Sequence, residues 1–124
     1  MQFTNERRVK PRVAASFDLR LGLPGLVAPA RVRDISASGV CCFTDRAIPA
    51  MTQVQLVLLV PDADARAARE VVCGGAVVRS HRLPGAPHPR SFETAIFFTE
   101  MRDDDREILE GFIALARPSS ANAG

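Results

Sequence analysis

Residues 30–43 read ARVRDISASGVCCF, and this stretch decides how the rest of the chain is interpreted. Apolar residues alternate with arginines as far as Arg33, a pattern typical of a half-buried β-strand. Residues 34–39 combine Asp, Ser and Gly, which form turns through side-chain hydrogen bonds to the backbone and through positive φ at Gly39. Residues 40–43 are apolar again and predict a short strand. The stretch therefore predicts a strand, a tight turn and a second strand.

Four further segments outside this hairpin have strand character. Residues 13–21 alternate between apolar and polar side chains, and the turn-forming sequence GLPG follows at 22–25. The first strand of the hairpin itself begins at residue 28 and contains Pro29, which indicates a sheet edge or a bulge. Three more strands are predicted at 53–60, 71–79 and 92–99. Gly74 and Gly75 lie inside one of them and indicate a bulge or a barrel corner.

The period changes near the C-terminus. Three consecutive acids at 103–105 are typical of a helix N-terminus, and apolar residues at 108, 109, 112, 113 and 116 follow at helical spacing. Six short antiparallel strands favour closure, because closure removes exposed sheet edges. We therefore predict a mainly all-β fold, a six-stranded antiparallel β-barrel with one C-terminal α-helix at 12–117. A mobile arm at 1–11 and a disordered tail at 118–124 would flank it.

Composition narrows the class of protein. The 124 residues are 47% hydrophobic, enough for one domain with a proper core, and the net charge is +2. The three cysteines, Cys41, Cys42 and Cys73, have no zinc spacing, so we expect buried, reduced thiols. No apolar run approaches the length of a membrane span, and the polar, basic start does not resemble a signal peptide. We expect a cytoplasmic protein.

Residues for catalysis are sparse. The two histidines, His81 and His88, flank or lie in a Pro-rich loop, with no Ser or Cys assignable as a nucleophile. Carboxylates cluster only at 103–105, where helix capping explains them. A Gly-rich phosphate loop is also missing. The sequence therefore predicts no enzyme, no catalytic residue, no metal site and no cofactor.

Two short motifs acquire meaning in combination. Arg8 and Arg12 are four residues apart before the first strand, and Asp34, Ser36 and Gly39 form D-x-S-x-x-G after the second. Alone, the first is an ordinary basic arm and the second an ordinary turn. Together, R-x-x-x-R, one hairpin and D-x-S-x-x-G resemble the signature of the PilZ domain family.

The resemblance extends over most of the chain, from Glu6 to Arg117. It includes the strands around the second motif, the strand at 92–100 and the acid-capped helix. One departure is Ala95, where the family often has Gly, and we expect it to affect packing rather than ligand. The family is one of six-stranded barrels that bind cyclic di-GMP. The resemblance therefore implies that fold and that ligand.

Chemistry supports a role for each motif residue. Arg8 and Arg12 can form bidentate hydrogen bonds to phosphate oxygens or to guanine O6 and N7. Asp34 can accept hydrogen bonds from guanine N1–H and N2–H₂, which adenine does not offer in that pattern. Ser36 can bond to phosphate or a base edge, and Gly39 lets the backbone approach closely.

Basic residues outside the two motifs extend this prediction. Arg7, next to the first motif arginine, resembles family members that bind a stacked pair of ligand molecules. Arg79, His81 and Arg82 leave a strand and could reach the far side of the ligand. Ligand would wrap the arm against the barrel, and that ordering would signal to a partner protein.

Three functions stay open on the sequence alone. The first is a cyclic di-GMP receptor that acts on an unidentified protein effector in motility, biofilm formation or a related process. The second is a PilZ-like interaction module that works without nucleotide, for example in pilus or motility assembly. The third is a nucleic-acid-binding barrel, which the near-neutral charge and the lack of a stacking series of aromatic residues oppose.

Overall fold

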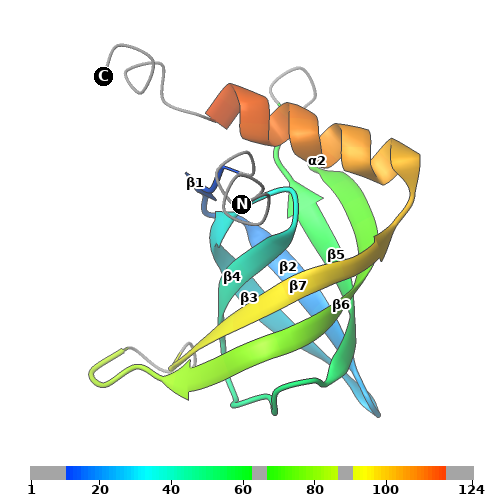
Figure 1. The fold of residues 1–124 in the computed structure, drawn as a ribbon. Coiled ribbons are helices and arrows are strands. Elements are labelled where there is room, and N and C mark those ends of the chain that lie inside the picture. The colour runs from blue at the N-terminus through cyan, green and yellow to red at the C-terminus, as the bar shows by residue number, and fades with distance from the viewer. Residues whose placement is uncertain (1–10, 63–66, 87–90, 117–124) are drawn as a thin grey trace, which may run out of the picture.

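The computed structural model describes residues 11–62, 67–86 and 91–116 (Figure 1). The elements in chain order are β1 (Val13–Ala14), β2 (Asp18–Leu23), β3 (Leu26–Ile35), β4 (Gly39–Thr44), β5 (Gln53–Val60), β6 (Arg69–Arg82), β7 (Phe92–Met101) and α2 (Asp103–Ala116). The predicted arm and tail lie outside the described residues, apart from the arm's last residue, Pro11.

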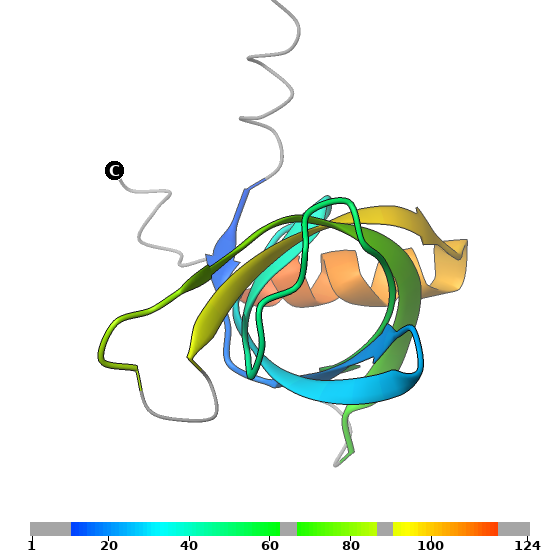
Figure 2. The same cartoon turned by 90° about the horizontal axis from the view of Figure 1, so that it is seen from below.

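The strands form a closed barrel. Each neighbour pairs antiparallel in the order β3, β2, β5, β6, β7, β4, and β4 pairs again with β3, so six strands complete the ring. The two-residue β1 adds to the end of β3. Figure 2 shows the ring from one end, with α2 lying across the far opening. The predicted six-stranded antiparallel barrel with one C-terminal helix is confirmed.

Apolar side chains fill the barrel and the space beneath the helix. The largest fully buried apolar residues are Leu19, Leu21, Val32, Ile35, Val40, Leu56, Leu58, Val60, Val71, Val77 and Leu109. Helix α2 buries Leu109 and Ile113, and the ring of Phe112 meets Phe17 edge to face at 5.4 Å between centroids. The helical spacing read from the sequence therefore marks the face that closes the barrel.

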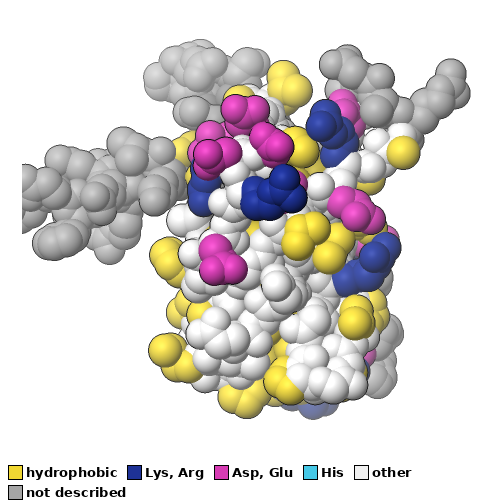
Figure 3. Space-filling view, turned by 90° about the vertical axis from the view of Figure 1, so that its right-hand side faces the viewer, with side chains coloured by type: hydrophobic (Ala, Val, Ile, Leu, Met, Phe, Trp, Pro, Cys, Tyr) yellow, Lys and Arg dark blue, Asp and Glu magenta, His cyan; other side chains and the backbone are white. Residues whose placement is uncertain are grey.

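Acidic residues start this helix, as predicted. Asp103, Asp104 and Asp105 form its first turn, and Figure 3 shows acidic side chains gathered at the top of the molecule, where α2 begins. Carboxylates there oppose the positive end of the helix dipole. The helix is too short and too polar to cross a membrane.

One predicted strand is divided. Residues 13–21 keep their alternation of buried and exposed side chains, but strand pairing stops at 15–17. Three residues there face only two of β3, residues 32–33, so the ladder must shift by one. Ala15 donates to and Phe17 accepts from the backbone of β3, over 3.1 and 2.8 Å, which keeps the segment extended.

The predicted turn is shorter than expected. Asp34 and Ile35 belong to β3 and pair with β4, and Gly39 already belongs to β4. The chain reverses at 36–38, closed by a 2.9 Å hydrogen bond from the Ser36 amide to the Gly39 carbonyl. Asp34 therefore sits on a strand rather than in a loop.

Two predicted irregularities are confirmed. Pro29 pairs with β2 on one side, whereas β4 pairs with β3 only from Ala30 onward, so the missing amide of Pro29 faces an open edge. Between Gly74 and Gly75, the register of β6 against β7 shifts. A Cβ on Gly75 would lie 2.7 Å from the Ile96 side chain, so this position has no room for one.

The three cysteines generate a prediction. All three are buried and free of disulfides, as expected, and burial raises the pKa of Cys42 and of Cys73 to about 12 and also raises the pKa of Cys41. We expect no alkylation by iodoacetamide at about pH 8 in the native protein, because the reactive thiolate is absent. Mass spectrometry should find three modified cysteines after unfolding in guanidinium.

The same burial gives a pH dependence. Thiols that ionise at about 12 when folded and near 9.0 when unfolded stabilise the fold below pH 9, and this contribution decreases as the pH rises from 9 towards 12. Rapid alkylation of the three thiols in the native protein at about pH 8 would contradict their burial.

Candidate functional site

Two β-bulges lie on adjoining parts of the barrel wall and turn polar side chains outward. Arg33 is an extra residue of β3 opposite β4, and Val78 is an extra residue of β6 opposite β7. A bulge breaks the strict alternation of a strand, so two consecutive side chains can face the same side. Arg33 and Asp34 therefore both leave the core, and so do Val78 and Arg79.

The carboxylate of Asp34 is held by two guanidinium groups. Nε of Arg12 is 2.5 Å from Oδ1, and Nε and Nη2 of Arg33 are each 2.7 Å from Oδ2. Nη1 of Arg12 also donates to Oγ of Ser36 over 3.0 Å, and that hydroxyl lies 3.2 Å from Oγ of Ser38. Arg12 precedes the β2–β3 hairpin in the chain, and Asp34, Ser36 and Ser38 lie at its end or beyond it. These four residues form one connected polar cluster.

Arg33 extends this cluster from β3 to β7. Its Nη1 donates to Oε2 of Glu93 on β7, whose side chain is only 11% exposed. The other oxygen of Glu93, Oε1, lies 3.4 Å from Nε2 of His81 on β6. Hydrogen bonding to Asp34 raises the pKa of Arg33 above its ordinary value, with Coulombic contributions from Cys41, Asp34 and Glu93. The Arg33 cation is therefore fixed between two carboxylates.

A hollow of about 320 Å³ opens beside this cluster. Three arginines, Arg12, Arg33 and Arg79, line it, and none of the described residues that line it carries a carboxylate. Apolar surface completes the wall, and Val78 and Phe97 expose more than half of their surface. Arginine side chains and exposed apolar surface together suit a ligand that combines negatively charged groups with flat, uncharged rings.

Gly39 has a structural reason to lack a side chain. A Cβ there would lie 2.5 Å from the carbonyl oxygen of Ile96 on β7. Positive φ was expected at Gly39, but among the described residues it occurs only at Gly25, Met51 and Gly85. The close approach that excludes a side chain is therefore made by a neighbouring strand.

The structure brings together most of the predicted site residues that it describes. Arg12 contacts both Asp34 and Ser36, and Gly39 and Arg79 line the hollow with Arg12. Asp34 and Ser36 are not among its lining residues and connect to it through Arg12; the Asp34 side chain is 15% exposed and Ser36 is 1% exposed. The other predicted residues, Arg7, Arg8, His81 and Arg82, are not among the residues that the structure places at the hollow.

Arg7 and Arg8 lie outside the described residues. His81 is not among the described residues that line the hollow; it lies 3.4 Å from Glu93, which binds Arg33. Arg82 lies over the ring of Phe92, 5.9 Å from its centroid. Of the basic residues that leave β6, Arg79 alone reaches the hollow, because the bulge at Val78 turns it outward.

Sequence reasoning missed Arg33 and Glu93. Arg33 was placed on the outward face of its strand, but nothing marked it as a second partner of Asp34. Glu93 is a single acid inside an apolar strand, 60 residues from its partner. A buried-strand pattern interrupted by an acid is the one available signal, because a carboxylate in such a place needs a cation.

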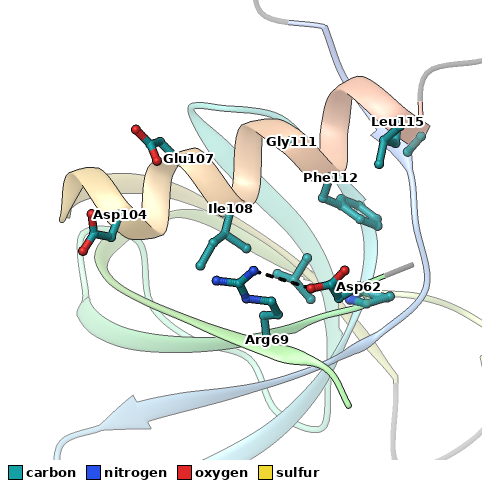
Figure 4. A pocket seen from close by; sticks show the side chains of 11 residues that line it. Asp62, Arg69, Asp104, Glu107, Ile108, Gly111, Phe112 and Leu115 are labelled. Atoms are coloured by element: carbon teal, nitrogen blue, oxygen red, sulfur yellow. Dashed lines mark ion pairs between the residues drawn. The ribbon is translucent and has the colours of Figure 1, made fainter. Parts of the chain in front are cut away.

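A larger hollow of about 840 Å³ lies between α2 and the ends of β5 and β6. Figure 4 shows the acidic side chains of Asp62, Asp104 and Glu107 around it, and Arg69 directed at Asp62, with 3.5 Å between Nη1 and Oδ2. Its lining therefore has more carboxylates than guanidinium groups, which disfavours an anionic ligand. The smaller hollow is the better candidate site.

Comparisons with known proteins agree with the geometry. The sequence matches the PilZ domain family over residues 6–115. The fold is similar to the Bacillus subtilis inhibitor of motility MotI/DgrA, with a TM-score of 0.71 and 17% identity over 87% of this chain and 50% of that one. This chain therefore spans half the length of that protein.

It is also similar to the PilZ domain of YcgR from Escherichia coli, whose structure was solved with c-di-GMP. The TM-score is 0.65, with 13% identity over 94% of this chain and 97% of that one. No curated protein matches the sequence. At these identities the two solved structures establish the fold.

Gly39 provides a test of the wall beneath the site. We expect Gly39→Ala to lower the free energy of unfolding by about 1–3 kcal/mol, because the new methyl group would press on the backbone of β7. Gly111→Ala is the matched control. Nothing lies within 4 Å of a Cβ there, so it should stabilise α2 by about 0.5–1 kcal/mol. Urea unfolding measures both, and an unchanged midpoint for Gly39→Ala would contradict the packing described.

Proposed function

Because this chain belongs to the PilZ domain family, we propose that it is a receptor for cyclic di-GMP that signals to a partner protein. The observation that carries the proposal is the contact of Arg12 with both Asp34 and Ser36. Residues from two separate motifs meet there beside a cationic hollow. The ligand would be bound rather than converted, and we propose no cofactor, metal or enzymatic step.

Each part of the site has a counterpart in the ligand. The two phosphates are anions that suit the guanidinium groups of Arg12 and Arg79. Asp34 would accept hydrogen bonds from guanine N1–H and N2–H₂, and Ser36 would bond to a phosphate or base edge. The exposed faces of Val78 and Phe97 offer apolar surface to the bases. A site built on such paired polar groups rejects a nucleotide that leaves them unpaired.

Binding on this scheme is an exchange. The ligand-binding atoms of Asp34 and Ser36 already have Arg12 as partner, so guanine must replace it. Arg12 would then turn to the ligand, with Arg8 and Arg7 beside it. Asp34 and Ser36 would have hydrogen-bond partners both before and after the ligand binds. The net gain in affinity is then small, but a base that cannot replace these bonds is rejected.

The output would be another protein, acting in the cytoplasm in motility, biofilm formation or a related process. Similarity to a motility inhibitor is compatible with this, although it concerns the fold. A module that works without nucleotide is the second candidate. The presence of both motifs, with Arg12 and Asp34 in contact, favours the receptor.

Titration calorimetry tests the receptor directly. We expect the wild type to bind cyclic di-GMP, and Arg12→Ala to weaken binding about 10- to 100-fold, the effect of losing a hydrogen bond to a charged group. Arg20→Ala, an exposed arginine on β2, is the control and should bind like the wild type. A folded wild type that releases no heat would support the nucleotide-independent module instead. The same titration counts ligand molecules per chain, and a value of one would contradict the pair expected from Arg7.

Hydrogen exchange tests the proposed role of residues 1–11. We expect their amides to exchange more slowly once cyclic di-GMP is bound, because Arg7, Arg8 and Arg12 would anchor the segment to the ligand. The strand residues 53–60 serve as internal reference, since this strand pairs with β2 and β6 in the barrel wall. Equal exchange of residues 1–11 with and without ligand would rule out the ordering step.

A further inference from the structure

The two arginines that bind Asp34 are held very differently. Their side chains are similarly exposed, 45% for Arg12 and 46% for Arg33, but their partners differ. Arg12 precedes the two-residue β1, and its guanidinium binds one carboxylate, that of Asp34, and the hydroxyl of Ser36. Arg33 is the bulge residue of β3, its carbonyl accepts a hydrogen bond from the Ala15 amide, and its guanidinium binds two carboxylates, those of Asp34 and Glu93. Arg12 can therefore leave Asp34 without breaking a second ion pair, whereas Arg33 is also held by Glu93.

Glu93 is the group that anchors Arg33. Its side chain is 11% exposed, and a carboxylate buried to that extent needs a charged partner. Arg33 supplies it through Nη1 while Nε and Nη2 bind Asp34. Because the guanidinium is a rigid planar fork, fixing one edge on Glu93 fixes the direction of the other.

We propose that Glu93 and Arg33 are positioning residues that make this site select guanine. The inference rests on the proposed function. When guanine displaces Arg12 from Oδ1 of Asp34, Arg33 stays on Oδ2. It keeps the carboxylate ionised and aimed at the hydrogen-bond donors of the base. Neither residue belongs to the two sequence motifs.

Loss of Glu93 would therefore change selectivity more than total affinity. Without it, the guanidinium of Arg33 is free to turn into the hollow, where it would bind the phosphates of any cyclic dinucleotide. Asp34 would lose its fixed orientation, so guanine would lose its advantage over adenine. A residue that only supported the fold would weaken both ligands together.

The test compares cyclic di-GMP with cyclic di-AMP, which has the same phosphate ring but adenine bases. We expect Glu93→Gln to reduce the ratio of the two affinities about tenfold, with cyclic di-AMP binding unchanged or stronger. Arg33→Lys should lower the ratio similarly, because an ammonium group keeps the charge but cannot bridge two carboxylates as a fork. Asp18→Asn is the control, since it breaks a 2.7 Å ion pair with Arg31, also on β3, that involves neither Asp34 nor Glu93.

The outcomes separate the two proposals. A wild type that does not bind cyclic di-GMP refutes the proposed function. A wild type that binds, with an unchanged affinity ratio in both Glu93→Gln and Arg33→Lys, overturns the positioning role alone. Thermal unfolding identifies any variant that fails to fold, and the other variant then decides.

Discussion

One extra residue in β3 determines the chemistry of this surface. Without the bulge at Arg33, strand alternation would put Arg33 and Asp34 on opposite faces of the barrel wall. With it, both side chains face outward, and the guanidinium can bind its own neighbour and Glu93 across the sheet. The matching bulge at Val78 turns Arg79 toward the same hollow. Closure of the barrel supplies the rigidity that keeps these directions fixed.

The cluster built on this bulge is satisfied in the absence of ligand. Among the described residues, no buried side-chain nitrogen or oxygen lacks a hydrogen-bond partner. Asp34 is neutralised from both sides, by Arg12, whose other partner is Ser36, and by Arg33, whose other partner is Glu93. The empty site therefore leaves few polar groups unsatisfied. A ligand can displace Arg12 only if it replaces the hydrogen bonds that Arg12 makes to Asp34 and Ser36. Selectivity follows from that requirement.

The strands and the helix were predictable because burial follows their periods, as at residues 28–32 and at Leu109 and Ile113. The break at 15–17 was not, because the alternation of polarity continues through these residues while only the regular strand pairing is interrupted. Arg12 and Asp34 were selected by a family resemblance, and no pattern in the sequence pointed to their contact. Glu93 escaped notice because its partner is distant in the chain, and topology alone joins them.

The central claim is that cyclic di-GMP replaces Arg12, and not Arg33, at the Asp34 carboxylate. NMR of the arginine Nε–H groups tests it most directly, with each signal assigned by its loss in Arg12→Lys or Arg33→Lys. The account predicts that adding the nucleotide shifts the Arg12 signal strongly, while the Arg33 signal stays slow to exchange with water and nearly unmoved. A saturated complex in which Arg12 is unchanged, or in which Arg33 loses its protection, would contradict it.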